Sequence, residues 1–215
     1  MASGSAPLPL VIASGNAGKI REFAALLAEL PLEIRSQPEG LEVEETGTSF
    51  AENARLKATA VARASGCWAL ADDSGLSVTA LEGAPGVQSA RYADSDTARI
   101  ARLLRELAAA DGRRASAGLP PDRTAHFTAA LAVADPSGRI RLEVEGTCPG
   151  EILEAPRGEG GFGYDPVFFV PELGLSFAEM DKATKASIGH RGRAFALLEP
   201  RLRQLLEGEA AMAAI

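Results

Sequence analysis

The sequence is poor in cysteine, has no long apolar run and carries no excess of basic residues. Its 215 residues include two cysteines, too few for a disulfide framework, which makes a reducing, cytoplasmic setting the expectation. No stretch approaches the roughly 18 apolar residues of a membrane span, and residues 1–9 lack the basic start and apolar core of a signal peptide. The formal net charge of -7 at pH 7 argues against a nucleic-acid polymer as partner, because such proteins present a basic face.

Length and composition are typical of one globular domain with a sizeable core. The chain is 46% hydrophobic and 24% charged, within the ordinary range for a globular domain. We assign residues 8–206 to a single domain built as two lobes. The small-residue stretch at 1–7 is expected to be disordered, and residues 207–215 are expected to form a C-terminal tail.

Apolar periodicity predicts strands joined by helices in the first part of the chain. Residues 8–13 form a continuous apolar run, which indicates a strand buried on both faces, followed by a glycine-containing turn and a helix that Pro31 ends. Ser49 and Glu52 form a capping-box pattern at the start of another helix. These elements favour an α/β arrangement.

Later elements include a strand, a helix, a hairpin and a final helix. Residues 68–71 predict a buried strand that ends at the acidic pair 72–73 and a turn at 74–75, and carboxylates at a strand exit usually face a crevice. A helix around residues 100–107 precedes a surface loop at 111–123. Two alternating segments at 125–133 and 140–144 flank a turn and predict an antiparallel hairpin. Pro200 is expected to kink or divide the last helix. The fold class is therefore α/β with a mixed sheet.

The first candidate site is a glycine-containing loop between strand and helix. Backbone N–H groups and the helix dipole at such a place favour phosphate, and Lys19 adds a charge in the first turn. The spacing differs from that of a P-loop, and no Ser or Thr follows the lysine. On its own, this segment is equally consistent with an ordinary turn. Its residues are Ser14, Gly15, Asn16, Ala17, Gly18 and Lys19.

The second candidate site is acidic. Glu45 precedes a glycine turn, and Asp72 and Asp73 follow the strand at 68–71. Mg²⁺ prefers a few carboxylates together with water and phosphate oxygens, so carboxylates from two separate segments suit it. Surface carboxylates are nevertheless far commoner than metal ligands.

The third and fourth candidate sites combine aromatic and basic residues. Phe162, Gly163, Tyr164 and Asp165 follow two glycines, so a base could stack on Phe162 while Asp165 accepts hydrogen bonds from base N–H groups; the alternative is a core-filling loop. Lys185, His190 and Arg191 come at the start of the last helix. Arg191 or Lys185 could bind phosphate, and His190 could donate to a base carbonyl.

Taken together and in order, these segments resemble the inosine triphosphate pyrophosphatase family, which acts on non-canonical purine nucleoside triphosphates. The resemblance covers residues 10 to about 206. It is carried by residues 14–19, 45–47, 50–54 with Lys57, 71–76, 83–87, 89–92, 161–166 and 185–192.

The resemblance implies a fold, a cofactor and an assembly. The fold would be an elongated, two-lobed α/β structure around a long mixed sheet with flanking helices, with the nucleotide in the cleft between the lobes. The enzyme would be a cytoplasmic, Mg²⁺-dependent homodimer that hydrolyses ITP, dITP and XTP to the monophosphate and pyrophosphate.

The resemblance also implies a role for each matched residue. Glu45 and Asp73 would coordinate Mg²⁺, and Asp73 would act as base for the attacking water. Lys57 and Asp72 are two further candidates. Residues expected to bind substrate are Ser14, Gly15, Asn16, Ala17, Gly18, Lys19, Ser74, Phe162, Gly163, Tyr164, Asp165, Lys185, His190 and Arg191.

Two positions depart from the family pattern, and two rival functions stay open. Ser14 stands where threonine is common, and Gly189 stands where serine is common, which removes a polar contact and loosens the backbone near the base pocket. One rival is a pyrimidine-directed pyrophosphatase of the related Maf type. The other is a nucleotide-binding sensor without hydrolysis, which would have no need of the acidic residues.

Overall fold

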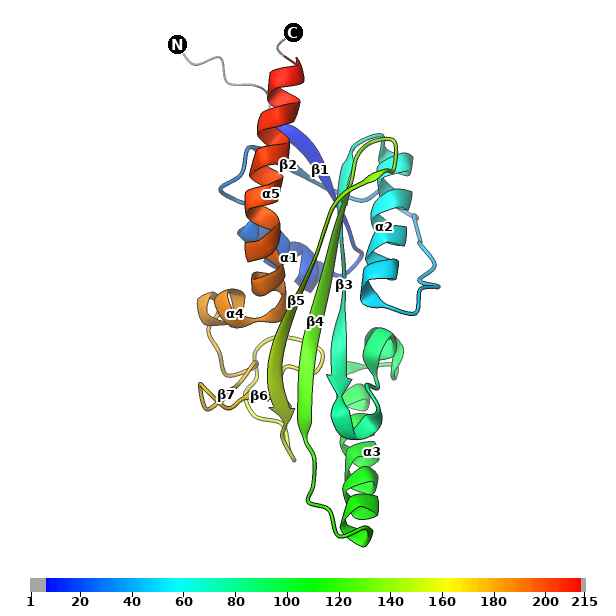
Figure 1. Cartoon of the computed structure of the whole chain (residues 1–215), viewed down its shortest axis with the longest axis vertical. Coiled ribbons are helices and arrows are strands. Elements are labelled where there is room, and N and C mark those ends of the chain that lie inside the picture. Colours follow the sequence, from blue (N-terminus) through cyan, green and yellow to red (C-terminus); the bar gives the residue numbers. More distant parts are fainter. Residues whose placement is uncertain (1–6, 214–215) are drawn as a thin grey trace. The chain divides into compact units, whose positions relative to one another are not determined.

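A mixed sheet with flanking helices forms the framework of the protein, as the sequence predicts. The computed structural model of the chain describes residues 7–213. The sheet has seven strands in the order β2-β1-β3-β4-β5-β6-β7 (Figure 1). Strand β1 pairs in parallel with β2 and β3, whereas β6 pairs antiparallel with β5 and β7. The strands are β1 (Leu8–Ala13), β2 (Leu32–Ser36), β3 (Trp68–Val78), β4 (Thr124–Ala134), β5 (Ile140–Ile152), β6 (Phe168–Val170) and β7 (Leu175–Ser176).

Helices precede or follow most of the strands. They are α1 (Ala17–Leu26), α2 (Phe50–Ser65), α3 (Asp96–Ser116), α4 (Lys182–Ile188) and α5 (His190–Ala213), with short 3₁₀ helices at Thr79–Leu81 and Gly86–Arg91. Among the residues that the structure describes, no helix is long and apolar enough to cross a membrane. The chain divides into two compact units, residues 7–73, 130–146 and 192–213 in the first and residues 74–129 and 147–191 in the second.

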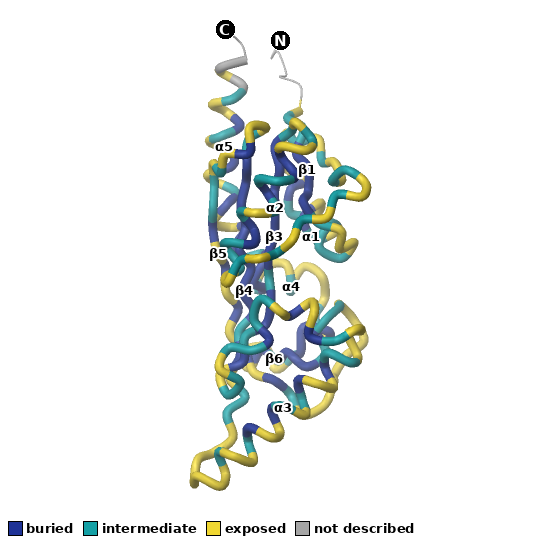
Figure 2. Tube along the Cα trace, turned by 90° about the vertical axis from the view of Figure 1, so that its right-hand side faces the viewer, coloured by how far each residue is buried: buried dark blue, intermediate teal, exposed yellow. Residues whose placement is uncertain are grey.

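The first unit has a core made largely of alanine. Nine of the eleven buried residues in the cluster that joins α2 to β1, β3 and β4 are alanine, and such short side chains let a helix lie close to a sheet. Figure 2 shows the buried residues along β1, β3 and β4. Helix α2 begins as predicted: the Ser49 side chain accepts from the Glu52 N–H, and the Glu52 side chain accepts from the Ser49 N–H. The capping box thus determines where α2 begins.

The second unit has an aromatic core. Phe127, Phe168 and Phe177 are buried, with ring centroids 4.7 Å apart in the Phe127–Phe168 and Phe168–Phe177 pairs. His190 stacks on Phe127 at 4.7 Å. Contacts of this kind fix rings in place, so the start of α5 is anchored by aromatic packing.

Several sequence predictions about the first unit are wrong in their boundaries. Helix α1 ends at Leu26, before Pro31, and the edge strand β2 after it was not expected. Strand β3 does not end at residue 71 but continues to Val78, so the predicted turn at 74–75 is strand. Helix α5 is not divided at Pro200, which lies inside it.

Boundaries in the second unit also differ from the prediction. Helix α3 continues to Ser116, so the first half of the predicted 111–123 loop is helical. Lys185 lies on a separate short helix, α4, and not on the last helix. The hairpin formed by β4 and β5 is confirmed, with its turn at 135–138. Of the predicted disordered segment 1–7, only Pro7 lies within the described residues, and α5 extends through the expected tail as far as Ala213.

Candidate active site

The glycine-containing loop at residues 14–19 caps helix α1. Asn16 is the N-cap, and its Oδ1 accepts from the Gly18 N–H at 2.8 Å and from the Lys19 N–H at 3.1 Å. The Asn16 N–H in turn donates to Ser14 Oγ at 3.1 Å. Those N–H groups, expected from the sequence to be free for phosphate, are therefore engaged within the loop. The helix dipole and the Lys19 ammonium remain as the features that favour an anion here.

Carboxylates from two segments meet at one lysine in the first unit. Lys57 Nζ lies 2.6 Å from Glu45 Oε1 and 3.0 Å from Asp73 Oδ1, and donates to the Asp72 carbonyl oxygen at 2.9 Å. Asp72 Oδ2 pairs with Lys19 Nζ at 2.8 Å. The structure thus brings together all five sequence-predicted residues of this unit that carry full charges, which we call the acidic cluster: Lys19, Glu45, Lys57, Asp72 and Asp73.

Local structure explains why Glu45 points inward. Leu41 and Val43 pack against the alanine-rich core, and exposure alternates along residues 41–47. An extended chain places every second side chain on the same side, so Glu45 follows Leu41 and Val43 toward the interior. Lys57 reaches the same place from α2.

Burial and charge shape the acid–base properties of the cluster. Burial raises the pKa of Asp73, the charge of Lys57 opposes this rise, and the nearby charge of Glu45 adds to it. Burial by itself lowers the pKa of Lys57, but the charges of Asp73 and Glu45 outweigh it and raise that pKa. Lys57 is therefore an ammonium at neutral pH, held by two carboxylates.

Asn53 also belongs to this cluster, although sequence reasoning did not include it among the site residues. Its Nδ2 donates to Asp73 Oδ2 at 3.1 Å, and its Oδ1 accepts from the Gly47 N–H at 2.8 Å. The signal available in the sequence was its spacing of four from Lys57, which places both side chains on one face of α2.

The acidic cluster fits a magnesium ion by its donor set. Glu45 Oε1 and Asp73 Oδ1 both lie within hydrogen-bond distance of one cationic atom, Lys57 Nζ, so two carboxylate oxygens converge where positive charge is held. Within residues 7–213, no group of three or more His, Cys, Asp or Glu side chains is placed to hold a metal. Two carboxylates nevertheless match Mg²⁺, which takes its other ligands from water and substrate phosphate.

A second cluster, in the second unit, combines one aromatic ring with four polar or charged groups. Asp165 Oδ2 pairs with Lys185 Nζ at 2.5 Å and accepts from the Phe162 N–H at 2.8 Å. Lys185 Nζ lies 5.0 Å from the centre of the Phe162 ring, and the Arg191 guanidinium lies 5.5 Å from it. Arg191 also donates to Ser74 Oγ at 2.6 Å. We call these residues the aromatic–basic cluster; they are five of the residues that the sequence predicts to bind substrate.

The carboxylate of Asp165 is almost fully buried. Burial raises its pKa, and the Lys185 charge opposes that rise. A buried carboxylate that keeps a cationic partner is well suited to accept hydrogen bonds from a ligand that reaches it.

Other predicted residues of this unit are engaged elsewhere. The Tyr164 side chain lies in the core, and its hydroxyl donates to the Ser89 carbonyl oxygen at 2.9 Å. The Gly163 N–H donates to Asp96 Oδ2 at 2.7 Å. His190 is 4% exposed and lies among phenylalanine rings. The Tyr164 hydroxyl, the Gly163 N–H and the His190 ring thus hold their parts of the second unit in place.

Gly189 has a role opposite to the loosening expected from the sequence. A Cβ on this residue would lie 2.6 Å from the Lys185 carbonyl oxygen, closer than such atoms approach. Glycine here permits the tight junction between α4 and α5, because only a residue without a side chain fits.

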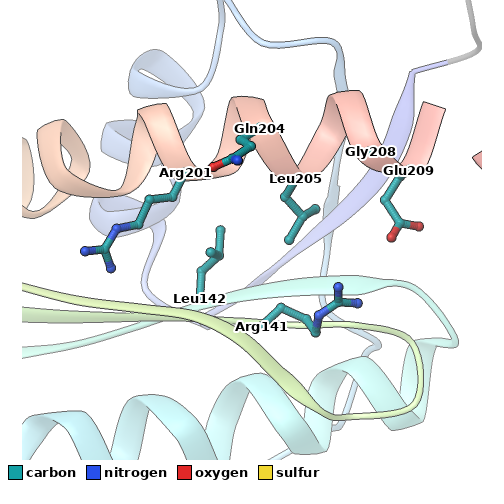
Figure 3. A pocket seen from close by; sticks show the side chains of 7 residues that line it. All are labelled: Arg141, Leu142, Arg201, Gln204, Leu205, Gly208 and Glu209. Carbon is teal, nitrogen blue, oxygen red and sulfur yellow. The ribbon is translucent and has the colours of Figure 1, made fainter. Parts of the chain in front are cut away.

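A separate cavity lies in the first unit between β5 and α5 (Figure 3). Its volume is about 570 Å³, and in Figure 3 the Arg141 and Glu209 side chains approach one another at one end. None of the sequence-predicted site residues lines it, so it is distinct from both clusters. The lining residues are Arg141, Leu142, Arg201, Gln204, Leu205, Gly208 and Glu209.

Comparisons with known proteins cover nearly the whole chain. A model of the Ham1 family matches residues 10–201. A protein of Parasynechococcus marenigrum (strain WH8102) named dITP/XTP pyrophosphatase is 60% identical, over 93% of this chain and 97% of its own. A protein of the same name from Nostoc sp. (strain PCC 7120 / SAG 25.82 / UTEX 2576) is 53% identical, over 94% of this chain and 97% of its own. The solved structure of a HAM1 protein from Coxiella burnetii is 41% identical in sequence and has a TM-score of 0.82. The match covers 92% of this chain and 99% of that one. The resemblance seen in the sequence is confirmed.

Proposed function

Because the chain belongs to the Ham1 family, we propose that it hydrolyses the non-canonical purine nucleoside triphosphates ITP, dITP and XTP. The products are the nucleoside monophosphate and pyrophosphate, and the reaction removes these triphosphates from the nucleotide pool. The observation that carries the proposal is the convergence of Glu45 and Asp73 on Lys57, in a chain whose relatives are named dITP/XTP pyrophosphatase. Paired carboxylates beside a cation are the groups that phosphoryl transfer requires.

We assign the phosphate chemistry to the acidic cluster. Glu45 and Asp73 would hold Mg²⁺, which when bound would offset charge on the phosphate oxygens and the departing pyrophosphate. Asp73 would accept a proton from the water that attacks the α-phosphorus, while the bond from that phosphorus to the β-phosphate oxygen breaks and pyrophosphate leaves with the electron pair. Burial raises the pKa of Asp73, which makes it a better proton acceptor than an exposed carboxylate.

Lysines of the same cluster would stabilise developing negative charge. Lys57 and Lys19 are both held by carboxylates, so each is preorganised and mostly shielded from water. A donor fixed in this way is often worth on the order of 3 kcal/mol in the transition state. The loop at residues 14–19 would contact the triphosphate.

We assign base recognition to the aromatic–basic cluster. The Phe162 ring would stack on the purine, and Asp165 would accept hydrogen bonds from base N–H groups. Donors on Lys185, His190 or Arg191 would face the 6-carbonyl of hypoxanthine or xanthine. Adenine presents an amino donor at that position, so a donor of the protein would be left facing another donor. Guanine shares the 6-carbonyl, and its rejection must depend on the 2-position.

The direct test is pyrophosphate release from six nucleotides at equal concentration. We expect release from ITP and XTP, much less from GTP, ATP, UTP and dTTP, and none when a chelator removes Mg²⁺. Faster turnover of UTP or dTTP than of ITP would favour the Maf-type alternative. Tight binding of ITP without release would favour a nucleotide sensor, and equal efficiency with GTP and ITP would refute the selectivity argument.

The role of Asp73 has its own test. Asp73→Asn keeps the size of the side chain but removes the proton acceptor, so this variant should bind ITP and hydrolyse it very slowly. Asp135, in the exposed hairpin turn, offers a matched control, because Asp135→Asn makes the same change outside the acidic cluster and should keep normal turnover. Normal turnover by Asp73→Asn would remove Asp73 from the mechanism.

We also propose that the protein is a homodimer in the cytoplasm, as the family resemblance implies. Light scattering should then give twice the 22.3 kDa of one chain. A single species at the mass of one chain would contradict the dimer without affecting the proposed reaction.

A further inference from the structure

Asn53 is a fully buried polar side chain in an apolar helix face. It is 0% exposed, and the other buried residues of α2 are Ala54, Ala58, Val61 and Ala62. A buried amide is costly unless its donors and acceptor are satisfied. Both ends of the Asn53 amide have partners, and both partners lead to carboxylates that we propose as metal ligands.

The first partner fixes the orientation of Asp73. Asn53 Nδ2 donates to Asp73 Oδ2 at 3.1 Å, and Lys57 Nζ donates to Asp73 Oδ1 at 3.0 Å. An ionised carboxylate only accepts hydrogen bonds, so each oxygen has a donor of its own. The amide therefore holds Oδ2 and leaves Oδ1 to Lys57 Nζ, which Glu45 also contacts.

The second partner fastens the segment that carries Glu45. Asn53 Oδ1 accepts from the Gly47 N–H at 2.8 Å, two residues after Glu45. Gly47 lies close against α2, because a Cβ on it would be 2.6 Å from Glu52 Cβ and 2.7 Å from Asn53 Oδ1. This close approach requires glycine and holds the backbone beside Glu45 in place.

We propose that Asn53 is a positioning residue that holds the two carboxylates, Glu45 and Asp73, in the arrangement that binds one divalent cation. The proposal rests on the proposed function and adds to it a residue that touches neither the substrate nor the cation. One amide serves both ligand-bearing segments, since its acceptor holds the backbone next to Glu45 and its donor orients Asp73. Hydrogen bonds of this kind orient metal-binding carboxylates, and their loss typically costs about 10- to 100-fold in metal affinity or activity.

The test compares Asn53→Ala with a control of similar structural cost. Val61→Ala also truncates a fully buried residue of α2 but lies two turns further along the helix, outside the acidic cluster. For each folded variant, we would measure the thermal midpoint, kcat and KM for ITP with Mg²⁺, and the affinity of the nucleotide-free protein for Mn²⁺ by electron paramagnetic resonance.

The expected result separates positioning from packing. Both variants should lower the thermal midpoint. Asn53→Ala alone should reduce kcat and Mn²⁺ affinity by about 10- to 100-fold, the usual cost of losing a group that supports a metal ligand, with little change in KM. Val61→Ala should keep kcat and Mn²⁺ affinity near those of the parent protein.

Three results would overturn the proposal. The first is parent-like kcat and Mn²⁺ affinity in Asn53→Ala. The second is an equal loss in Val61→Ala, which would make the effect one of stability alone. The third is a parent protein that binds no Mn²⁺ at millimolar concentration. If Asn53→Ala does not fold, Asn53→Ser provides the same test, because one short hydroxyl cannot serve both partners. If the parent protein releases no pyrophosphate from any nucleotide, the proposed function fails, while Mn²⁺ affinity still decides the role of Asn53.

Discussion

Removal of the Lys57 charge should destabilise the protein by an amount that reveals how strongly the acidic cluster repels itself. Lys57 Nζ lies 2.6 Å from Glu45 Oε1 and 3.0 Å from Asp73 Oδ1. Methionine at this position keeps the length of an unbranched chain but no charge, so Lys57→Met would leave two carboxylates facing each other.

The magnitude follows from burial. The side chains of Lys57, Glu45 and Asp73 are 14%, 18% and 9% exposed. Removal of one partner from a buried ion pair costs about 3–5 kcal/mol. Because each group keeps some access to water, we expect the lower end, about 3 kcal/mol of unfolding free energy. On the same helix, Arg55 pairs with Glu143 at 2.6 Å, but these side chains are 43% and 34% exposed, so Arg55→Met should cost about 0–1 kcal/mol.

Urea unfolding in chelator and again in Mg²⁺ measures this effect. In chelator, Lys57→Met should lose far more stability than Arg55→Met. In Mg²⁺, the unpaired carboxylates of Lys57→Met should bind the ion, which would restore about 1.4 kcal/mol at ten times its Kd. A loss below about 1 kcal/mol in chelator, the range of exposed ion pairs, would refute the reasoning. If Mg²⁺ stabilises neither Lys57→Met nor the parent protein, the carboxylates are not a metal site.

Three further predictions concern the surrounding structure. Ser49→Ala removes the N-cap of α2 and should lower the unfolding free energy by about 1 kcal/mol in urea unfolding while kcat stays the same. Gly189→Ser places a Cβ 2.6 Å from the Lys185 carbonyl oxygen; overpacking of this kind costs about 1–3 kcal/mol, and a raised KM for ITP should accompany it. Burial and the Glu106 carboxylate raise the pKa of Tyr92 to about 12 from 10.0. The folded state therefore favours neutral Tyr92, and its contribution, complete below pH 10, should be lost as the pH rises to about 12. Tyr92→Phe should flatten the alkaline fall in thermal midpoint, and an unchanged slope would contradict this.

The elements that could be predicted from the sequence are those whose signals are local. The apolar run of β1 matches its bounds, Leu8–Ala13. Ser49 and Glu52 mark the start of α2, and both hydrogen bonds of the capping box are present. Each of these features depends on residues within a few positions of one another, so a short window of sequence contains the physical cause.

The elements that were mispredicted depend on distant partners. An Asp-Asp-Ser-Gly segment normally leaves a sheet, but β3 continues through it. Lysines of α1 and α2 pair with Asp72 and Asp73, so the two carboxylates can be buried within the strand. Pro200 normally breaks a helix at a cost of about 3 kcal/mol. It lies on the exposed side of α5, while Leu198 and Leu202 are buried on either side of it, and their burial offsets that cost.

The same contrast between local signals and distant partners applies to the site. Sequence reasoning identified Glu45, Lys57 and Asp73, but the contacts among them span 12 and 16 residues, and the contact of Asn53 with Asp73 spans 20. A local sequence pattern cannot show that residues so far apart in the chain are in contact. One signal was nevertheless present, because Asn53 lies within the buried stripe of a helix whose other buried residues are alanine and valine. An amide in such a stripe must find partners across the core, and here the partner of its donor is the carboxylate of Asp73. A polar residue inside an apolar stripe is therefore the sequence feature that indicates the centre of this site.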